Sequence, residues 1–216
     1  VDERQRNQRQ CDNDRNCDEE FPFVCETRSG KLTPPDDTNG NEVPPGQDCA
    51  SMDFAGTGYV EVGDSPALVA ALTDFSDGLT IESWVRLNST GCGIIARKHV
   101  GSNMGFEFSL QPGGEIRFFS EGNVAGAADS GSYVPLGEWT HVAATLDGQK
   151  VRIWNNGVMV HEADHILPEP TTDSLLIGAF PPGNKCYLDG ALSQLRISSG
   201  VVYTENFDPP AVLASD

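Results

Sequence analysis

The residues with the most recognisable catalytic spacing are HEADH, from His161 to His165, which match the H-E-x-x-H motif of zinc proteases. That chemistry needs both histidines on one face of a helix, where they hold one Zn²⁺ while the glutamate acts as general base. Here the motif follows the turn sequence NNG and a valine-rich run, and Pro168 comes soon after it. These neighbours predict a strand. Residues four apart on a strand are separated by ~13 Å, so we expect no zinc protease chemistry.

A second pattern, DNDRN from Asp12 to Asn16, imitates the start of an EF-hand calcium loop. Cys17 stands where that loop needs glycine, and Phe23 stands where it needs a bidentate glutamate. We therefore interpret this stretch as a solvated acidic loop between disulfides. The sequence contains no G-x-S-x-G elbow, P-loop or dinucleotide-binding fingerprint.

The six cysteines indicate the compartment of the protein. Four of them lie in the first quarter of the chain, at Cys11, Cys17, Cys25 and Cys49. Zinc sites usually bring cysteines in close pairs, often with histidines nearby. These cysteines are more widely spaced, and the first histidine is His99. Disulfides in an oxidising environment are the better interpretation, so we expect an extracellular or cell-surface protein.

The charge of the chain limits its partners. It has 32 acidic and 14 basic residues, for a formal net charge of −18. Such a surface repels nucleic acid and anionic lipid and tolerates cations such as Ca²⁺. No apolar run approaches the ~20 residues of a membrane span, so we expect no membrane insertion. Val1 is followed at once by polar residues, which we interpret as a mature chain whose export signal has been removed.

The composition changes along the chain. Residues 1–30 form a cysteine-rich acidic segment that cannot build a core of its own, and residues 31–48, with two Pro-Pro pairs, are expected to form an extended linker. From position 49 to about 210, short β-prone runs alternate with turn residues, which predicts an all-β domain. Residues 211–216 are left as a C-terminal tail.

Eleven runs of that domain are predicted as strands. They are 51–54, 58–62, 79–87, 93–98, 105–110, 114–120, 139–146, 149–155, 157–163, 174–179 and 187–197. Turn sequences such as Asp147-Gly148 separate neighbouring runs, which favours antiparallel hairpins. The only helix-like stretch is PALVAAL at 66–72, so a doubly wound nucleotide-binding fold is excluded. In 80–87, TIESWVRL, residues alternate between two faces, and Trp84 on the polar face suggests that this face is covered too.

Three segments resemble a known family. These are SMDFAGTGYVEV at 51–62 with LTIESWVRL at 79–87, GEWTHVAATLDGQKVRIWNNGVMV at 137–160, and YLDGALSQLRISSGVVYTENFDPP at 187–210. In this order they resemble laminin-G-like domains of the concanavalin A-like lectin/glucanase superfamily. The resemblance implies a two-sheet antiparallel jelly-roll sandwich. It also implies that Trp84 and Trp139 are buried between the sheets, and that His141 is a structural histidine with satisfied hydrogen bonds.

The resemblance includes glucanases, which raises the question of hydrolysis. Glycoside hydrolysis needs two carboxyl groups ~5–9.5 Å apart, and the glucanases of this fold place theirs on one strand as Glu-x-Asp-x-x-Glu. That run is absent here. The acids on the predicted strands are single, at Glu82, Glu107, Glu115 and Glu162. We therefore expect no enzymatic activity.

The resemblance also implies a ligand site in loops at one rim of the sandwich. The corresponding residues are Ser102, Asn103, Asn184 and Asp189. Asn103 and Asp189 would offer the oxygen ligands that Ca²⁺ requires. The last strand of relatives often carries two acids where this chain has Ser193 and Gln194, and few acids gather in these loops. An ordinary polar rim is the alternative.

The resemblance pairs the strand 79–87 with the strand 187–197, which would bring Cys92 and Cys186 together in a disulfide. The other four cysteines permit three pairings, of which we favour Cys11–Cys25 with Cys17–Cys49. Asn88-Ser89-Thr90 is an N-glycosylation sequon on a predicted loop, relevant in a source that glycosylates.

Two functions follow from these observations. The first is a secreted, non-catalytic binding or adhesion module that recognises a glycan or an extracellular protein, with Ca²⁺ as the candidate cofactor. The second is a structural subunit of an extracellular filament or coat, which self-assembles when residues 1–48 dock on a neighbouring subunit.

Overall fold

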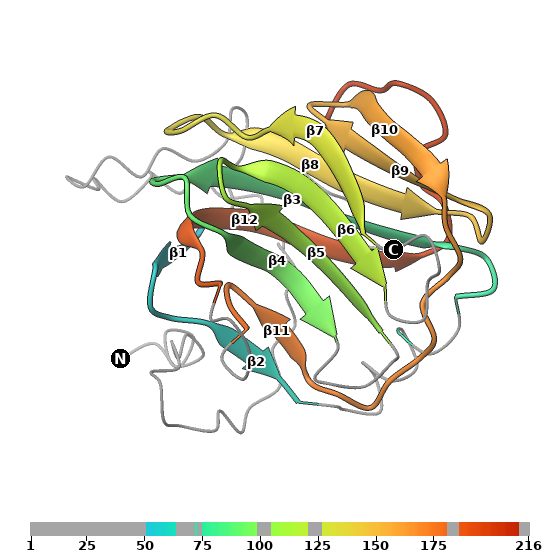
Figure 1. The fold of residues 1–216 in the computed structure, drawn as a ribbon, viewed down its shortest axis with the longest axis horizontal. Coiled ribbons are helices and arrows are strands. Elements are labelled where there is room, and N and C mark those ends of the chain that lie inside the picture. Colours follow the sequence, from blue (N-terminus) through green and yellow to red (C-terminus); the bar gives the residue numbers. More distant parts are fainter. Residues whose placement is uncertain are drawn as a thin grey trace, which may run out of the picture.

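The computed structural model describes residues 51–63, 72, 75–98, 105–120, 127–180 and 186–211. The described residues form two antiparallel sheets of six strands each, which pack face to face (Figure 1). The all-β sandwich expected from the sequence is thereby confirmed. Within the described part of the chain, no helix is long and apolar enough to cross a bilayer.

The front sheet faces the viewer in Figure 1. Its strands, in spatial order, are β2 (Val60–Val62), β11 (Leu175–Ile177), β4 (Gly93–Lys98), β5 (Phe106–Gln111), β6 (Glu115–Ser120) and β7 (Ala128–Tyr133). The back sheet lies behind it. Its strands, in spatial order, are β1 (Met52–Ala55), β12 (Asp189–Ser199), β3 (Leu79–Leu87), β8 (Thr140–Leu146), β9 (Lys150–Asn155) and β10 (Val158–Asp164).

The core fills the space between the two sheets because each strand turns alternate apolar side chains inward. Ile81, Val85 and Leu87 of β3 are fully or almost fully buried there, as are Phe106 and Phe108 of β5. Burying one side chain of this size contributes about 1.5–3 kcal/mol. The core therefore supplies a rigid frame, and the outward residues of the same strands are available for contacts with solvent, with other parts of the chain or with a ligand.

All eleven predicted strands occur, with ends shifted by a few residues, and one further strand, β7, was missed. Its sequence, ADSGSY, has small and polar residues where an alternating apolar pattern would be expected. It forms because it pairs with β6, at Arg117↔Asp129 and Phe118↔Ala128. Of the stretch 66–72, only Leu72 is among the described residues, and it is buried.

The pairing of β3 with β12 is antiparallel, with Leu87 opposite Gly190, as the family resemblance implied. A disulfide joins Cys92, just after β3, to Cys186, just before β12, and their Cα atoms are 5.1 Å apart. The expected pairings Cys11–Cys25 and Cys17–Cys49 lie outside the described residues.

Residues 201–211 form a segment that we call the C-terminal strap. It leaves β12 and crosses the outer face of the back sheet, and Figure 1 shows it in red beside β9 and β10. The Val202 amide donates to Thr80 Oγ1 at 3.0 Å, and the Phe207 amide donates to the Gly157 carbonyl at 2.9 Å. Farther along, Trp84 Nε1 donates to the Pro210 carbonyl at 3.2 Å. The strap is therefore hydrogen-bonded to the back sheet along its length.

The strap corrects the expected positions of two tryptophans. Trp84 is buried, but on the outer face of the back sheet beneath the strap and not between the sheets. Trp139, just before β8, is only half-buried, and the Arg86 guanidinium lies over its ring at 5.4 Å. The prediction that both rings lie between the sheets was wrong. The alternation of β3 assigns the inner face to Ile81, Val85 and Leu87, which leaves Trp84 on the outer face. Trp139 instead packs against the outward side chain of Arg86.

Candidate functional site

A buried charged cluster lies between the back sheet and the strap. The Glu82 side chain is fully buried, and its Oε1 accepts from Arg196 Nε at 2.7 Å. Its Oε2 accepts from His141 Nε2 at 3.0 Å and from the Tyr203 hydroxyl at 2.8 Å. Because a carboxylate only accepts, Nε2 of His141 carries the proton. Three strands and the strap thus converge on one carboxylate.

The electrostatics of this cluster favour an ionised glutamate. Burial alone would raise the pKa of Glu82, but the hydrogen bond from His141 and the Arg196 charge and hydrogen bond outweigh it, so the pKa is lowered. Burial and the neighbouring Glu82 carboxylate raise the pKa of the Tyr203 phenol. Tyr203 therefore stays a neutral donor to Glu82.

Aromatic rings of the strap and of the back sheet pack around this cluster and bury it. Phe207 stacks on Tyr203 with ring centroids 3.5 Å apart. The same Phe207 ring meets Trp154 at 5.5 Å and His141 at 5.7 Å. His141 is fully buried, as expected for a structural residue, but its Nδ1 has no hydrogen-bond partner. Because its carboxylate and imidazole are both shut off from solvent, we interpret the cluster as the anchor of the strap.

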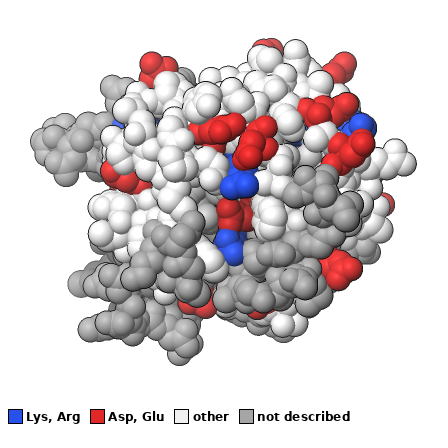
Figure 2. All heavy atoms as spheres, viewed as in Figure 1, with Lys and Arg blue, Asp and Glu red and all other residues white. Residues whose placement is uncertain are grey.

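The outer face of the front sheet carries a different arrangement, which we call the front-face grid. The strand register places its residues in three rows across the sheet. The rows are Arg97–Glu107–Phe119, Ser109–Arg117–Asp129 and Gln111–Glu115–Tyr133. Figure 2 shows blue and red atoms alternating across this face of the molecule.

The grid is held by contacts between oppositely charged and polar neighbours. Arg97 is ion-paired with Glu107, whose Oε1 accepts from Ser109 Oγ at 2.8 Å. Arg117 Nε lies 3.1 Å from Asp129 Oδ1. The Arg117 Nε atom is buried and makes no hydrogen bond of its own, so this contact is an ion pair without an aligned Nε–H hydrogen bond.

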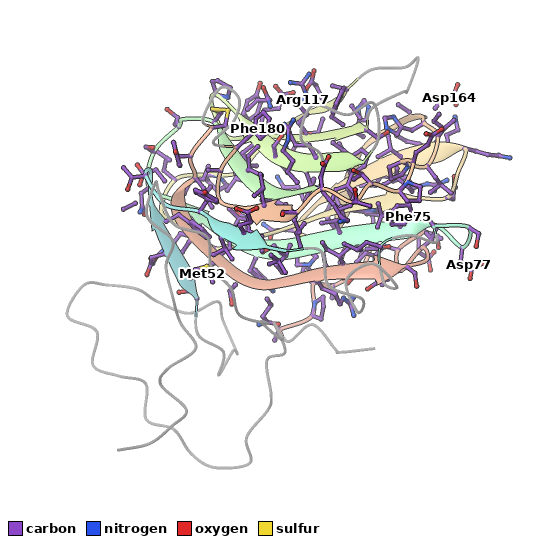
Figure 3. All side chains as sticks on the ribbon, turned by 90° about the horizontal axis from the view of Figure 1, so that it is seen from below. Met52, Phe75, Asp77, Arg117, Asp164 and Phe180 are labelled. Atoms are coloured by element: carbon purple, nitrogen blue, oxygen red, sulfur yellow. A yellow bond between two sulfur atoms is a disulfide. The ribbon has the colours of Figure 1, made fainter. Side chains whose placement is uncertain are left out.

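Solvent access to the grid increases from one side to the other. Only 10% of the Arg97 side chain is exposed, because the Phe180 ring lies against its guanidinium at 3.5 Å. By contrast, 31% of the Arg117 side chain and 52% of the Asp129 side chain are exposed. Figure 3 shows Arg117 and Phe180 on the same outer side of the front sheet. The grid therefore presents fixed donors and acceptors to solvent, as a ligand surface requires.

The residues predicted at the rim are only partly placed. Ser102, Asn103 and Asn184 lie outside the described residues. Asp189 is the first residue of β12, pairs with Ala55 and accepts the Asn88 amide at its backbone carbonyl at 2.9 Å. Among the described residues, no group of three or more His, Cys, Asp or Glu side chains is arranged to hold a metal ion. Asn88 is exposed in the loop after β3.

The HEADH motif lies on a strand, as predicted. His161 belongs to β10, opposite Ile153 of β9, and Glu162 accepts from Arg152 Nε at 2.8 Å. His165 follows the strand and is buried, with Nε2 2.9 Å from Ser120 Oγ. Burial lowers the pKa of His165 to about 4, so its imidazole is neutral at physiological pH. The two histidines therefore serve separate parts of the fold.

The four single acids considered for hydrolysis do not form pairs. Glu82 is in the buried cluster, and Glu162 of β10 is separated from it by β8 and β9. In the front sheet, Glu115 is opposite Gln111, four residues along β5 from Glu107. That is roughly 13 Å along the strand, beyond the ~5–9.5 Å that glycosidase carboxyls require.

The grid was missed from the sequence, although a signal was present. In FEFSLQ and EIRFFS, polar residues alternate with apolar ones, and this places Glu107, Ser109 and Gln111 of β5 on one face with Glu115 and Arg117 of β6. The alternation marks a solvated face. It does not reveal which charges meet across the strands, because that depends on register.

Solved structures with the same fold share little sequence with this chain. Domain 4 of AbnA, an extracellular GH43 arabinanase from Geobacillus stearothermophilus solved with arabinotriose, has a TM-score of 0.54 and 18% identity, covering 73% of this chain and 78% of that one. The CBM40 domain of the Ruminococcus gnavus IT-sialidase, bound to α2,3-sialyllactose, has a TM-score of 0.56 and 16% identity, covering 73% and 92%. Domains LG4–5 of the mouse laminin α1 chain give 0.53 and 14%, covering 71% and 45%. No curated protein sequence is significantly similar to this chain.

The family comparison agrees with the architecture and with the resemblance seen in the sequence. The family described as the concanavalin A-like lectin/glucanases superfamily, of the laminin G type, matches residues 54–205. This range includes both sheets except the first residues of β1, and the first part of the strap, up to residue 205. The chain therefore belongs to the concanavalin A-like lectin/glucanases superfamily.

Proposed function

We propose that this chain is a secreted, non-catalytic binding module and that the front-face grid is its ligand surface. The observation that carries the proposal is the solvent-exposed Arg117–Asp129 pair beside half-exposed aromatic rings on a rigid sheet. Guanidinium, carboxylate, hydroxyl and amide groups at fixed positions suit a ligand rich in hydroxyl groups, and ring faces suit its C–H surfaces. A glycan has both features.

Three further findings support this proposal. Two of the similar structures were solved with oligosaccharides bound. The Cys92–Cys186 disulfide fits an extracellular location. The four acids at Glu82, Glu107, Glu115 and Glu162 lack the pairing that glycoside hydrolysis needs, so binding without catalysis is the simpler activity.

Calcium remains part of the proposal through the rim. Asn103 and Asp189 are the proposed Ca²⁺ ligands, and Ser102 and Asn184 the proposed ligand contacts beside them. An extracellular protein is the alternative ligand. The filament alternative depends on residues 1–48, which lie outside the described residues.

A glycan array probed with and without EDTA tests the proposal. We expect binding by the wild type and loss of more than tenfold in affinity for Arg117→Ala, because a charge-assisted donor is removed from the exposed part of the grid. Arg152→Ala is the matched control, since Arg152 is also an ion-paired arginine, with Asp147 and Glu162 as its partners, but lies on the back sheet. Equal loss in both variants, or no glycan bound by the wild type, would refute the grid as a glycan site. Loss of binding in EDTA would support the rim Ca²⁺ site.

A further inference from the structure

We infer that the grid selects neutral glycans and rejects acidic ones. The inference rests on the function proposed above and specifies the ligand class of the same surface. It starts from the charges of the grid, which comprise two guanidinium groups, at Arg97 and Arg117, and three carboxylates, at Glu107, Glu115 and Asp129. The grid therefore has a net charge of −1 even though arginines are its most prominent donors.

Each arginine of the grid already has an anionic neighbour. Arg97 is ion-paired with Glu107, and Arg117 with Asp129. A ligand carboxylate or sulfate that approached Arg117 would come within a few ångströms of Asp129 and would have to displace it or bear the repulsion. Like charges placed opposite one another disfavour a partner.

A hydroxyl group meets no such penalty. It can accept from a guanidinium N–H and donate to the neighbouring carboxylate at once, because an O–H is both donor and acceptor. The Arg117–Asp129 ion pair, whose side chains are 31% and 52% exposed, places a guanidinium beside a carboxylate. Because Arg117 Nε is itself buried, a ligand hydroxyl would accept from a terminal N–H of the guanidinium. In the neighbouring strand, the half-buried Gln111 adds a neutral amide that donates to the hydroxyl of the buried Ser109 at 3.5 Å. Vicinal hydroxyls of a sugar match this alternation, whereas a ligand anion can only accept.

The net charge of the whole chain also disfavours acidic ligands. The chain has a formal net charge of −18, so its long-range field slows the approach of polyanions at low ionic strength. Among the described grid residues, no lysine supplements the two arginines. A surface selected for acidic glycans would require an excess of positive charge at the contact.

The test uses the full chain on matched probes. Cellotetraose, xylotetraose and lactose represent neutral glycans, and tetragalacturonate, sulfated lactose and α2,3-sialyllactose represent acidic ones. Affinity is measured by calorimetry in low and high salt, and the contact residues are located by NMR chemical-shift changes. We expect at least one neutral probe to shift the amides of β5, β6 and β7, with an affinity that salt changes less than twofold. The acidic probes should bind at least tenfold more weakly.

Two substitutions with the same charge change separate the grid from the general field. Asp129→Asn should weaken neutral binding about tenfold, because a charged acceptor is lost, and it should allow acidic probes to bind at the same amides. Asp164→Asn is the control, since Asp164 is an exposed, ion-paired acid on the back sheet. It should change neither affinity. Unchanged thermal unfolding of both variants would show that the fold is intact.

The outcomes distinguish selection for neutral glycans from glycan binding itself. If acidic probes bind the wild-type grid as well as neutral ones, the inference is overturned and the glycan-binding function stands. If Asp164→Asn admits acidic probes as readily as Asp129→Asn, the overall charge governs selection and the grid does not. If no probe shifts the front-sheet amides, both proposals fail.

Discussion

The two outer faces of this sandwich carry the same kind of ion pair in different surroundings. On the back sheet, the Arg196–Glu82 pair is covered by the strap, and none of the Glu82 side chain is exposed. On the front sheet, the Arg117–Asp129 pair leaves 52% of the Asp129 side chain in solvent. The residue types are alike. What differs is whether another part of the chain covers them.

Cover changes the energetics of an ion pair. A buried carboxylate has lost its hydration and depends on every hydrogen bond that its neighbours donate. An exposed pair is partly hydrated, contributes about 0–1 kcal/mol to stability, and can exchange water for a ligand at little cost. Where the strap crosses the back sheet, the outer face is an internal interface occupied by the chain itself, whereas the front-face grid is the surface that we propose for a ligand.

The largest expected difference between the two faces comes from removing one carboxylate from each. Glu82→Ala should lower the free energy of unfolding by about 3–5 kcal/mol, because Arg196 and His141 would be left buried without their acceptor. Asp129→Ala should lower it by less than about 1 kcal/mol. Urea unfolding followed by tryptophan fluorescence measures both. Similar losses in the two variants would contradict the assignment of a structural back face and a free front face.

A smaller effect is expected from two glycines with similar backbone angles. Gly157 has φ +74°, and a Cβ there would lie 1.8 Å from the Phe207 carbonyl oxygen of the strap. Gly131 of β7 has φ +66°, with open space around the added Cβ. Gly131→Ala should cost only the strain of the left-handed conformation, about 1–2 kcal/mol. Gly157→Ala should cost more, because the strap must also move.

Chemical denaturation measures the two glycine variants, and tryptophan fluorescence reports the strap, since Phe207 packs against Trp154. We expect a fluorescence change in folded Gly157→Ala and none in folded Gly131→Ala. If the two variants lose equal stability and both keep wild-type fluorescence, the strap does not press on the β9–β10 turn.

The sequence was sufficient for the fold because strand alternation and turn residues are local signals. The alternation in 79–87 even indicated that both faces of this strand are covered. It could not say what covers the outer face, so Trp84 was assigned to the wrong layer. The strap carries no regular pattern, and its return over Trp84 depends on contacts between residues more than a hundred positions apart.

The candidate site was harder to predict for a related reason. Glu107, Glu115 and the strands that carry them were identified, but Asp129 lies on β7, whose sequence has no strand pattern of its own. Without β7 there is no partner for Arg117, and the front face looks like a row of single charges. A site built across strands becomes visible only when register is known. The rim loops were considered instead because the family resemblance implied a ligand site there.

A pH dependence of stability further separates buried from exposed groups. Burial holds the pKa of His165 at about 4 in the fold, below its ordinary value of 6.5. The unfolded chain therefore binds a proton at His165 between these two values, while the folded chain does not, so stability should fall as pH drops from 6.5 towards 4.

Protonation of Glu82 should lower stability further, at a lower pH than protonation of His165. The pKa of Glu82 in the fold is below 4.5, so the stability that it contributes is present above pH 4.5 and is lost as pH falls through the folded value. His165→Gln should flatten the upper part of the profile and leave the lower part unchanged, as measured by thermal unfolding from pH 7 to pH 3. An unaltered slope between pH 6.5 and 4 in His165→Gln would show that this histidine is not the group that titrates there.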